Sequence, residues 1–208
     1  GENWASHEEK IQENWINKIK SDDIVLIPGD ISWAMRLKDA MTDLGWIDSL
    51  PGKKILLRGN HDYWWVSVSK MNKLFENMCF LQNNFYAYQD YALCGTRGWL
   101  SPNEVKFDEH DKKVYDRELH RLRLSLDAAK KKGFKKYIVM THYPPSNEKF
   151  QRSGFLDIYE EYGVEKVIYG HLHGKDSFRM GLKGIDNGIE YILVSCDYID
   201  FNPVKILD

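Results

Sequence analysis

Side chains that can bind metal ions follow four short apolar segments of the sequence. Pro-Gly-Asp ends at Asp30, Arg-Gly-Asn-His-Asp covers residues 58–62, Thr-His ends at His142, and Gly-His-Leu-His covers residues 170–173. Carboxylate, amide and imidazole donors without a thiolate suit Mn, Fe, Zn or a similar divalent ion. Side chains alternate between two faces in extended backbone, so we expect His171 and His173 to point the same way.

The apolar segments before these groups are predicted to be buried strands of an α/β fold. Strands are expected at residues 24–27, 54–57, 79–81, 85–88, 91–95, 137–140, 164–169 and 191–195. Helices are expected at 35–49, 66–75, 111–131 and 154–162, and a first helix should follow a capping box of Ser6 and Glu9. Ligands of α/β sheets bind beyond the carboxyl ends of the strands, so the four polar groups should meet at one edge.

The composition indicates one folded domain without a strong charge. The chain has 208 residues, 29 Lys plus Arg against 31 Asp plus Glu, and a hydrophobic share of 43%. At roughly 100–200 residues per domain, a single domain over residues 1–208 is the simplest organisation. The near-neutral charge argues against a dedicated nucleic-acid binder. No run of about 18 apolar residues is present, so we expect no membrane-spanning helix.

The cysteines and the start of the chain bear on its location. Cys79, Cys94 and Cys196 are widely separated and odd in number, which is typical of free thiols in a reducing compartment. The first residues lack the charged and apolar regions of a signal peptide. We therefore expect a cytoplasmic protein.

In order and spacing, Gly29-Asp30, residues 59–62, His142 and residues 170–173 resemble the calcineurin-like metallophosphoesterases. They match four of the five sequence blocks of that superfamily. The resemblance implies a four-layer α/β/β/α sandwich of two mixed sheets flanked by helices, with two divalent metal ions between the sheets. It implies that Asp30 bridges both ions and that His173 belongs to one site. The other site is completed by Asn60, His142 and His171.

The first block of the superfamily, an Asp-x-His strand end, has no counterpart before Asp30. His7 stands at the start of a predicted helix, and Asp22 and Asp23 precede a strand rather than end one. We therefore expect a fold that lacks its first strand, in a domain that is incomplete at its N-terminus. Only Asp30 and His173 remain for the second of the two ions, so we expect that second site to be weak and incompletely occupied.

The predicted activity is that of a metal-dependent phosphohydrolase, either a phosphatase or a phosphodiesterase. Two ions about 3.5–4 Å apart would clamp the phosphate and hold a bridging hydroxide that attacks phosphorus. His61 is the candidate general acid for the leaving group, because imidazole titrates near neutral pH. Asp62 would orient or charge-stabilise His61, or support the site from outside the metal shell.

Other residues after the strands are candidates for substrate contact. Arg97 could bind the substrate phosphate through its guanidinium fork. Residues 98–111 lack a clear period and are predicted to form a loop over the cleft. The aromatic residues at these strand ends either pack in the core or form a wall that stacks a nucleobase; they are Trp33, Tyr63, Trp64, Trp65 and Tyr143.

Two other functional classes compete with the phosphohydrolase. A catalytically silent metal-binding or scaffold domain of the same fold is disfavoured by His61, because a scaffold needs no general acid, and is favoured by the missing first block. A nuclease needs a basic groove for its strand, which the balanced charge hardly supports. The partner we expect is therefore a small phosphorylated substrate, with no nucleic acid and no membrane.

Overall fold

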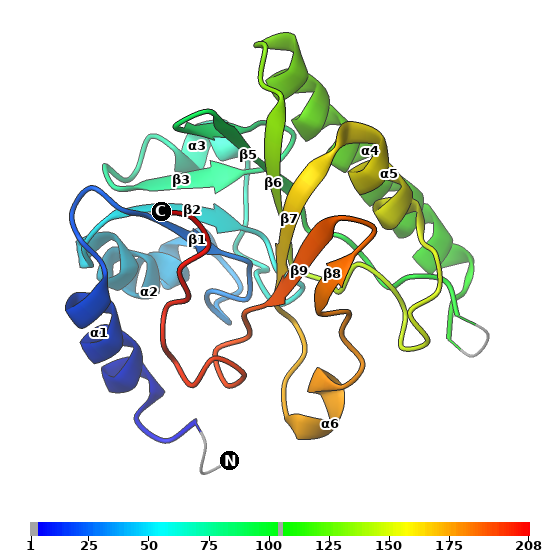
Figure 1. Ribbon diagram of the computed structural model, residues 1–208. Helices are drawn as coiled ribbons and strands as arrows, with labels where there is room; N and C mark the ends of the chain where they lie inside the picture. The colour runs from blue at the N-terminus through cyan, green and yellow to red at the C-terminus, as the bar shows by residue number, and fades with distance from the viewer. Residues whose placement is uncertain (1–3, 104–105) are drawn as a thin grey trace.

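The computed structural model describes residues 4–103 and 106–208 (Figure 1). Helices and strands alternate along much of the chain, as the sequence predicts. The helices are α1 (His7–Lys18), α2 (Leu37–Ser49), α3 (Val68–Met71), α4 (Glu109–Lys131), α5 (Gly154–Tyr162) and α6 (Lys175–Phe178). The strands are β1 (Ile24–Ile27), β2 (Lys53–Leu57), β3 (Met78–Leu81), β4 (Tyr86–Tyr88), β5 (Tyr91–Thr96), β6 (Lys136–Thr141), β7 (Val164–Tyr169), β8 (Gly184–Asp186) and β9 (Ile189–Leu193).

These strands form two sheets. The smaller sheet has the order β1-β2-β3 and is parallel throughout its described strands. The larger sheet has the order β4-β5-β6-β7-β9-β8 and is mixed, because β4 and β8 pair antiparallel at its two edges. Its inner strands β5, β6, β7 and β9 are parallel. Their carboxyl ends therefore lie at one edge of the sheet.

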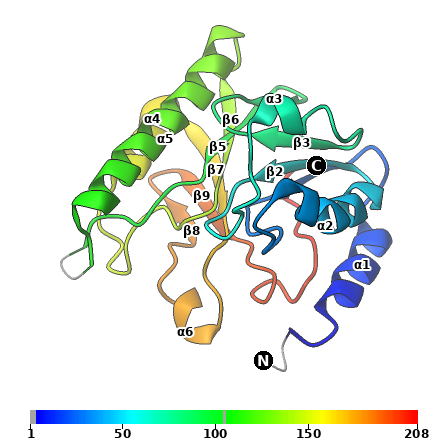
Figure 2. The ribbon, with the colours of Figure 1, turned by 180° about the vertical axis from the view of Figure 1, so that it is seen from behind.

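The two sheets pack face to face, and helices cover their outer faces. On β2, Ile55 and Leu57 point into the core between the sheets, whereas Leu56 points toward α2 and α3. On β6, Met140 faces the other sheet, whereas Val139 faces α4 and α5. This alternation is what buried strands require. Figures 1 and 2 show α4 and α5 over the larger sheet and α2 by the smaller one, so the predicted four-layer α/β/β/α architecture is confirmed.

Three details of the predicted elements differ in the structure. Ser6 has a left-handed backbone and no side-chain capping bond, so the capping box predicted there is wrong. The helix predicted over 66–75 is only α3, and beyond it the Asn72 side chain accepts a hydrogen bond from the Phe80 N–H. A capping box does form at α4, between Asp108 and Asp111. Where these helices begin and end depends on contacts that local sequence patterns do not contain.

Three further predictions concern the cleft loop, a membrane-spanning helix and the first strand. Of the loop expected over 98–111, residues 104 and 105 lie outside the described residues, and Glu109 onward belongs to α4. None of the described helices combines the length and the apolar character needed to cross a membrane. Within the described ranges, no strand precedes β1.

Candidate active site

The loops after β1 and β2 touch each other through their backbones. A Cβ added to Gly29 would lie 2.5 Å from the backbone nitrogen of Gly59, and one added to Gly59 would lie 2.1 Å from Asp30 Oδ1. Both positions therefore need glycine. Asp30 itself has a φ of 55°, a left-handed conformation that is uncommon for a residue with a side chain and is often found at functional sites. The close approach brings Asp30 beside the segment that carries Asn60 and His61.

Asp62 ties the same two loops together. Its buried carboxylate accepts hydrogen bonds from the backbone N–H groups of Asp30, Ile31, Ser32 and Gly59 at 2.7–3.1 Å, and from the Trp64 indole at 3.0 Å. Burial raises the pKa of the Asp62 carboxyl, and the hydrogen bonds from Gly59, Ser32 and Ile31 act against that rise. Asp62 therefore supports the backbone that carries the neighbouring polar side chains.

The predicted orienting contact between Asp62 and His61 is absent from the described residues. All the hydrogen bonds of the Asp62 carboxylate go to backbone N–H groups and to Trp64, and His61 Nδ1 is buried without a partner. Of the roles expected for Asp62, the geometry matches support from outside the metal shell. The contact does not form, because the side chains of adjacent residues point in different directions.

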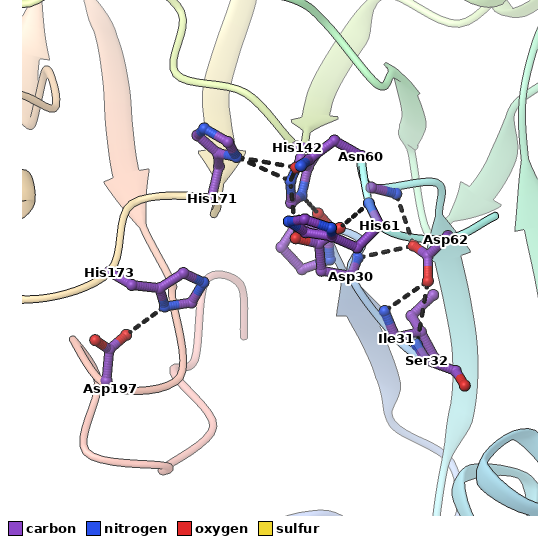
Figure 3. A network of polar contacts seen from close by, with 12 residues as sticks. Asp30, Ile31, Ser32, Asn60, His61, Asp62, His142, His171, His173 and Asp197 are labelled. Atoms are coloured by element: carbon purple, nitrogen blue, oxygen red, sulfur yellow. Dashed lines mark hydrogen bonds and ion pairs between the residues drawn. The ribbon is translucent and has the colours of Figure 1, made fainter. Parts of the chain in front are cut away.

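Four of the predicted metal ligands meet where β1, β2, β6 and β7 end (Figure 3). Asn60 Oδ1 lies 2.7 Å from His142 Nε2 and 3.1 Å from His171 Nδ1. His142 Nε2 is 3.2 Å from His171 Nδ1 and 3.4 Å from Asp30 Oδ2. We call Asp30, Asn60, His142 and His171 the donor cluster. Both sheets contribute to it, so their packing decides its geometry.

The two imidazoles of the donor cluster are oriented by their surroundings. His142 is fully buried, and its Nδ1 lies 2.8 Å from the Pro28 carbonyl oxygen, which leaves Nε2 toward the cluster. His171 has a left-handed φ of 69°, and its ring packs on Tyr143 at 4.3 Å between ring centroids. Burial, followed by the charge of His142, lowers the pKa of His171 to about 4. A neutral imidazole is the form that binds a metal ion.

Asp30 is held in its charged form. Its burial acts to raise the pKa, but the hydrogen bond and charge interaction with His142 and the backbone N–H of His61 outweigh it. The pKa of the Asp30 carboxyl is therefore below its usual value. The ionised carboxylate is the form that binds a cation.

The chemistry of the donor cluster fits one divalent cation. Ligand atoms about 2.1 Å from a metal ion lie about 3.0–3.4 Å from one another in octahedral or tetrahedral geometry, and the cluster distances are 2.7–3.4 Å. The closest pair would move apart by about 0.3 Å to admit an ion. Within the described residues, no three His, Cys, Asp or Glu residues are already arranged to hold a metal. With the amide oxygen of Asn60 as a fourth donor and this small movement, the cluster can surround one ion.

His173, the fifth predicted ligand, lies apart from the donor cluster. Its Nδ1 is 2.8 Å from Asp197 Oδ1 (Figure 3). Its side chain is 44% exposed, and Trp4 contacts its ring edge-on. The prediction that His171 and His173 share one face of extended backbone is wrong, because the chain leaves β7 at Tyr169 and turns left-handed at His171. The structure therefore does not bring His173 and the four donors together.

Asp197 is a site residue to which sequence reasoning assigned no role. Besides its contact with His173, it accepts a hydrogen bond from the Gly174 N–H at 2.9 Å. Asp197 follows β9, which is the neighbour of β7 in the larger sheet. The rule that ligands gather beyond the ends of parallel strands could have found it, had the strand order been known.

His61 stands beside the donor cluster in an aromatic setting. Its backbone N–H donates to Asp30 Oδ1 at 2.9 Å, and its ring stacks on Trp33 with 4.1 Å between centroids and a 19° angle between planes. Tyr63 meets the His61 ring edge-on at 6.3 Å. In contrast, Trp64 and Trp65 are buried against α2 and α3. Of the aromatic residues predicted at the strand ends, Trp33 and Tyr63 are exposed beside His61, whereas Tyr143 is buried.

Arg97, the predicted phosphate ligand, points into a charged cluster behind the site. Its side chain is 13% exposed, lies 3.7 Å from the buried Glu118, and packs over the Trp99 ring. Arg117 and Arg121 pair with the same carboxylate. The backbone carbonyl oxygen of Arg97 accepts the N–H groups of His142 and Tyr143. The structure thus connects Arg97 to the donor cluster through its main chain, and its contact with substrate stays a prediction.

Comparison with known families agrees with this geometry. Residues 4–175 match the model of a family described as calcineurin-like phosphoesterase. This range includes the donor cluster, His61 and His173. The chain therefore belongs to the calcineurin-like phosphoesterase family.

Similarity to individual proteins is more limited. The chain is 41% identical over 56 residues to the gene 66 protein of Mycobacterium phage L5, covering 27% of each protein. It is 38% identical over 61 residues to the gene 66 protein of Mycobacterium phage D29, covering 28% of this chain and 30% of that protein. The matches thus span less than a third of these curated relatives.

Two solved structures share the fold. The protein TT1561 of Thermus thermophilus has a TM-score of 0.60 at 13% identity, over 93% of this chain and 84% of its own. The protein of unknown function AQ665 from Aquifex aeolicus has a TM-score of 0.50 at 18% identity, over 95% of this chain and 80% of its own. At these identities the similarity concerns the fold alone.

Proposed function

We propose that this protein hydrolyses a phosphomonoester or a phosphodiester of a small molecule at the donor cluster. The observation that carries the proposal is the convergence of Asp30, Asn60, His142 and His171, each of which has a donor atom 2.7–3.4 Å from that of at least one other member. Membership of the calcineurin-like phosphoesterase family supports a metal-dependent phosphoesterase. The four donors arise from strand ends of both sheets, so the substrate would bind where the two sheets meet.

The donor cluster would hold one divalent ion such as Mn, Fe or Zn. When bound, the ion supplies positive charge for the phosphoryl oxygens and activates water at neutral pH. Asp30 and His173 are the residues that would hold a second ion, which would add positive charge at the phosphate. Asp197 supports this assignment, because a carboxylate on Nδ1 orients a histidine to bind a metal through Nε2.

His61 is assigned the proton that goes to the leaving oxygen. Its Nδ1 is buried, so we assign the transferred proton to Nε2. The hydrogen bond from the backbone N–H of His61 to Asp30 and the stacking of its ring on Trp33 hold the imidazole beside the cluster. Tyr143 packs on His171 and keeps water from that side of the imidazole. These residues bind and orient the reacting groups before the reaction begins.

The test replaces His61 and follows metal content and turnover separately. In His61→Ala, we expect the manganese content to be retained and the hydrolysis of an alkyl phosphate to fall by about 10²- to 10⁴-fold, because an alkoxide leaving group needs a proton. His120→Ala is the matched control, since His120 is exposed on α4. Unchanged turnover would remove the proposed role of His61, and lost metal would make His61 a ligand. A metal-loaded wild type that hydrolyses neither mono- nor diesters would contradict the proposed function.

The location is proposed from the cysteines. Cys79, Cys94 and Cys196 are all free thiols in the described part of the chain. Free thiols persist in reducing compartments, so we propose a cytoplasmic location. Blocking the thiols of freshly lysed cells would show whether the three cysteines are reduced in place.

A further inference from the structure

Large apolar side chains are exposed next to His61. Trp33 is 72% exposed and Tyr63 50%, and both rings contact the His61 ring. The neighbouring Trp64 and Trp65 are buried in the core instead. An apolar patch exposed beside a reactive group is typical of a ligand-binding surface. The exposed tryptophan therefore needs an explanation that core packing does not supply.

The segment that presents Trp33 is held in place by hydrogen bonds. The N–H groups of Ile31 and Ser32 both donate to the Asp62 carboxylate. The buried Ser32 hydroxyl donates to Asp43 on α2. Trp33 lies directly after these anchors, and one face of its indole covers the His61 ring. The ring is thus positioned before any ligand arrives, which lowers the entropic cost of binding.

We propose that Trp33 and Tyr63 bind the aromatic ring of the leaving group, and that the substrate class is a nucleoside monophosphate. This inference rests on the proposed function. His61 gives its proton to the leaving oxygen, so the leaving group must lie beside His61, and therefore beside the two aromatic side chains that contact it.

The chemistry of the subsite explains the expected selectivity. In the reaction, the phosphorus–oxygen bond to the nucleoside breaks and a bond to the water oxygen forms. The leaving oxygen takes the His61 proton, and the proton that the attacking water loses is returned to His61 through solvent, so nucleotide and water give nucleoside and phosphate. Stacking accepts every base, because each base has an aromatic face. Trp33 and Tyr63 amount to a platform for one base, and the formal charge of −2 favours no long anionic strand. A mononucleotide thus fits better than a nucleic acid.

The experiment compares two esters with the same leaving oxygen. Adenosine 5′-monophosphate and ribose 5-phosphate both release a primary alcohol and differ in the base. Stacking of one base is worth about 5- to 150-fold in binding, so the wild type should favour the nucleotide by about 10-fold or more in kcat/KM. Trp33→Ala should bring that ratio near one, and Trp33→Phe should restore most of it. Because both substrates need the same proton, a misplaced His61 would change both rates and leave the ratio intact.

A matched control and a second readout keep the test decisive. Ile185→Ala removes an apolar side chain of β8 that is even more exposed than Trp33, and it should leave the ratio unchanged. Titration with adenosine, which carries no phosphate, should quench tryptophan fluorescence in the wild type and less in Trp33→Phe and Trp33→Ala. A ratio near one in the wild type, or one that Trp33→Ala does not alter, overturns the proposal even when both esters are hydrolysed.

Two other results separate this inference from the proposed function. If neither ester is hydrolysed but adenosine binding depends on Trp33, the subsite stands and the proposed hydrolysis fails. If Trp33→Ala converts a dimer into a monomer on gel filtration without altering the substrate ratio, the patch binds a second copy of the chain and the proposal is overturned.

Discussion

The donor cluster and the His173–Asp197 pair hold their imidazoles in different ways. The cluster is built from the ends of β1, β2, β6 and β7, and its His142 is fully buried. His173 lies on the segment between β7 and α6, is 44% exposed, and has Asp197 and Trp4 as its partners. Packed sheets thus preorganise the cluster, whereas a surface segment positions His173. The difference predicts a strong site at the cluster and a weaker one at His173.

The backbone around the two regions differs in the same sense. Gly29 and Gly59 touch so closely that neither tolerates a Cβ, and Asp62 binds four N–H groups from their loops. Beside His173, a Cβ on Gly174 would meet nothing within 4 Å, although its φ is 82°. The first region has no room to relax, while the second has open space. Substitutions should therefore lower the stability of the protein most in the first region.

Asp62→Ala should have the largest effect, because it removes the carboxylate that supports the backbone of the donor cluster. Each buried N–H left without an acceptor costs about 1–3 kcal/mol. Three buried donors, the N–H groups of Ser32 and Gly59 and the Trp64 indole, lose theirs, so the free energy of unfolding should fall by at least about 3 kcal/mol. Urea unfolding measures the change. Asp22→Ala, at an exposed aspartate, is the control and should stay within about 0.5 kcal/mol. A loss below about 1 kcal/mol in Asp62→Ala would show that water replaces the carboxylate.

His142→Ala and His173→Ala should show how the two regions differ in their affinity for Mn²⁺. Loss of the buried His142 should weaken Mn²⁺ binding by at least about 100-fold, beyond the effect of changing an outer partner. Loss of His173 should leave the tighter Mn²⁺ site in place and lower the metal content only if a second ion is bound. Calorimetric titration, with the metal content of the wild type as reference, measures both. Equal losses in the two variants would remove the distinction between the regions.

Asp197→Asn should have the smallest effect. The amide cannot supply the charge that orients His173, so affinity for a second ion should fall by about 10-fold, while the donor cluster is unaffected. Metal content at increasing Mn²⁺ concentration measures this, and Asp200→Asn, at an exposed aspartate of the same segment, is the control. If Asp197→Asn behaves as the wild type, the contact is a surface pair with no role in metal binding.

Much of the site could be predicted because its residues follow parallel strands. Asp30, Asn60, His142 and His171 were each predicted from an apolar run that ends in a polar residue, and the structure brings all four together. A supporting role for Asp62 was among the predictions, but the N–H groups that it binds could not be predicted, since they include residues about 30 positions earlier in the chain. The direction of the His173 side chain also could not be predicted, because it depends on the left-handed turn at His171.

The sequence by itself determined which side chains stand at the strand ends, because apolar alternation and glycine turns are local properties. It also determined the α/β class of the protein. The tertiary structure alone decided which aromatic residues are exposed: Trp33 and Tyr63 lie on the surface, while Trp64 and Trp65 are in the core. These four residues are chemically alike, and only the packing of α2 and α3 on the smaller sheet distinguishes them. Burial depends on contacts between distant segments, which no local pattern encodes.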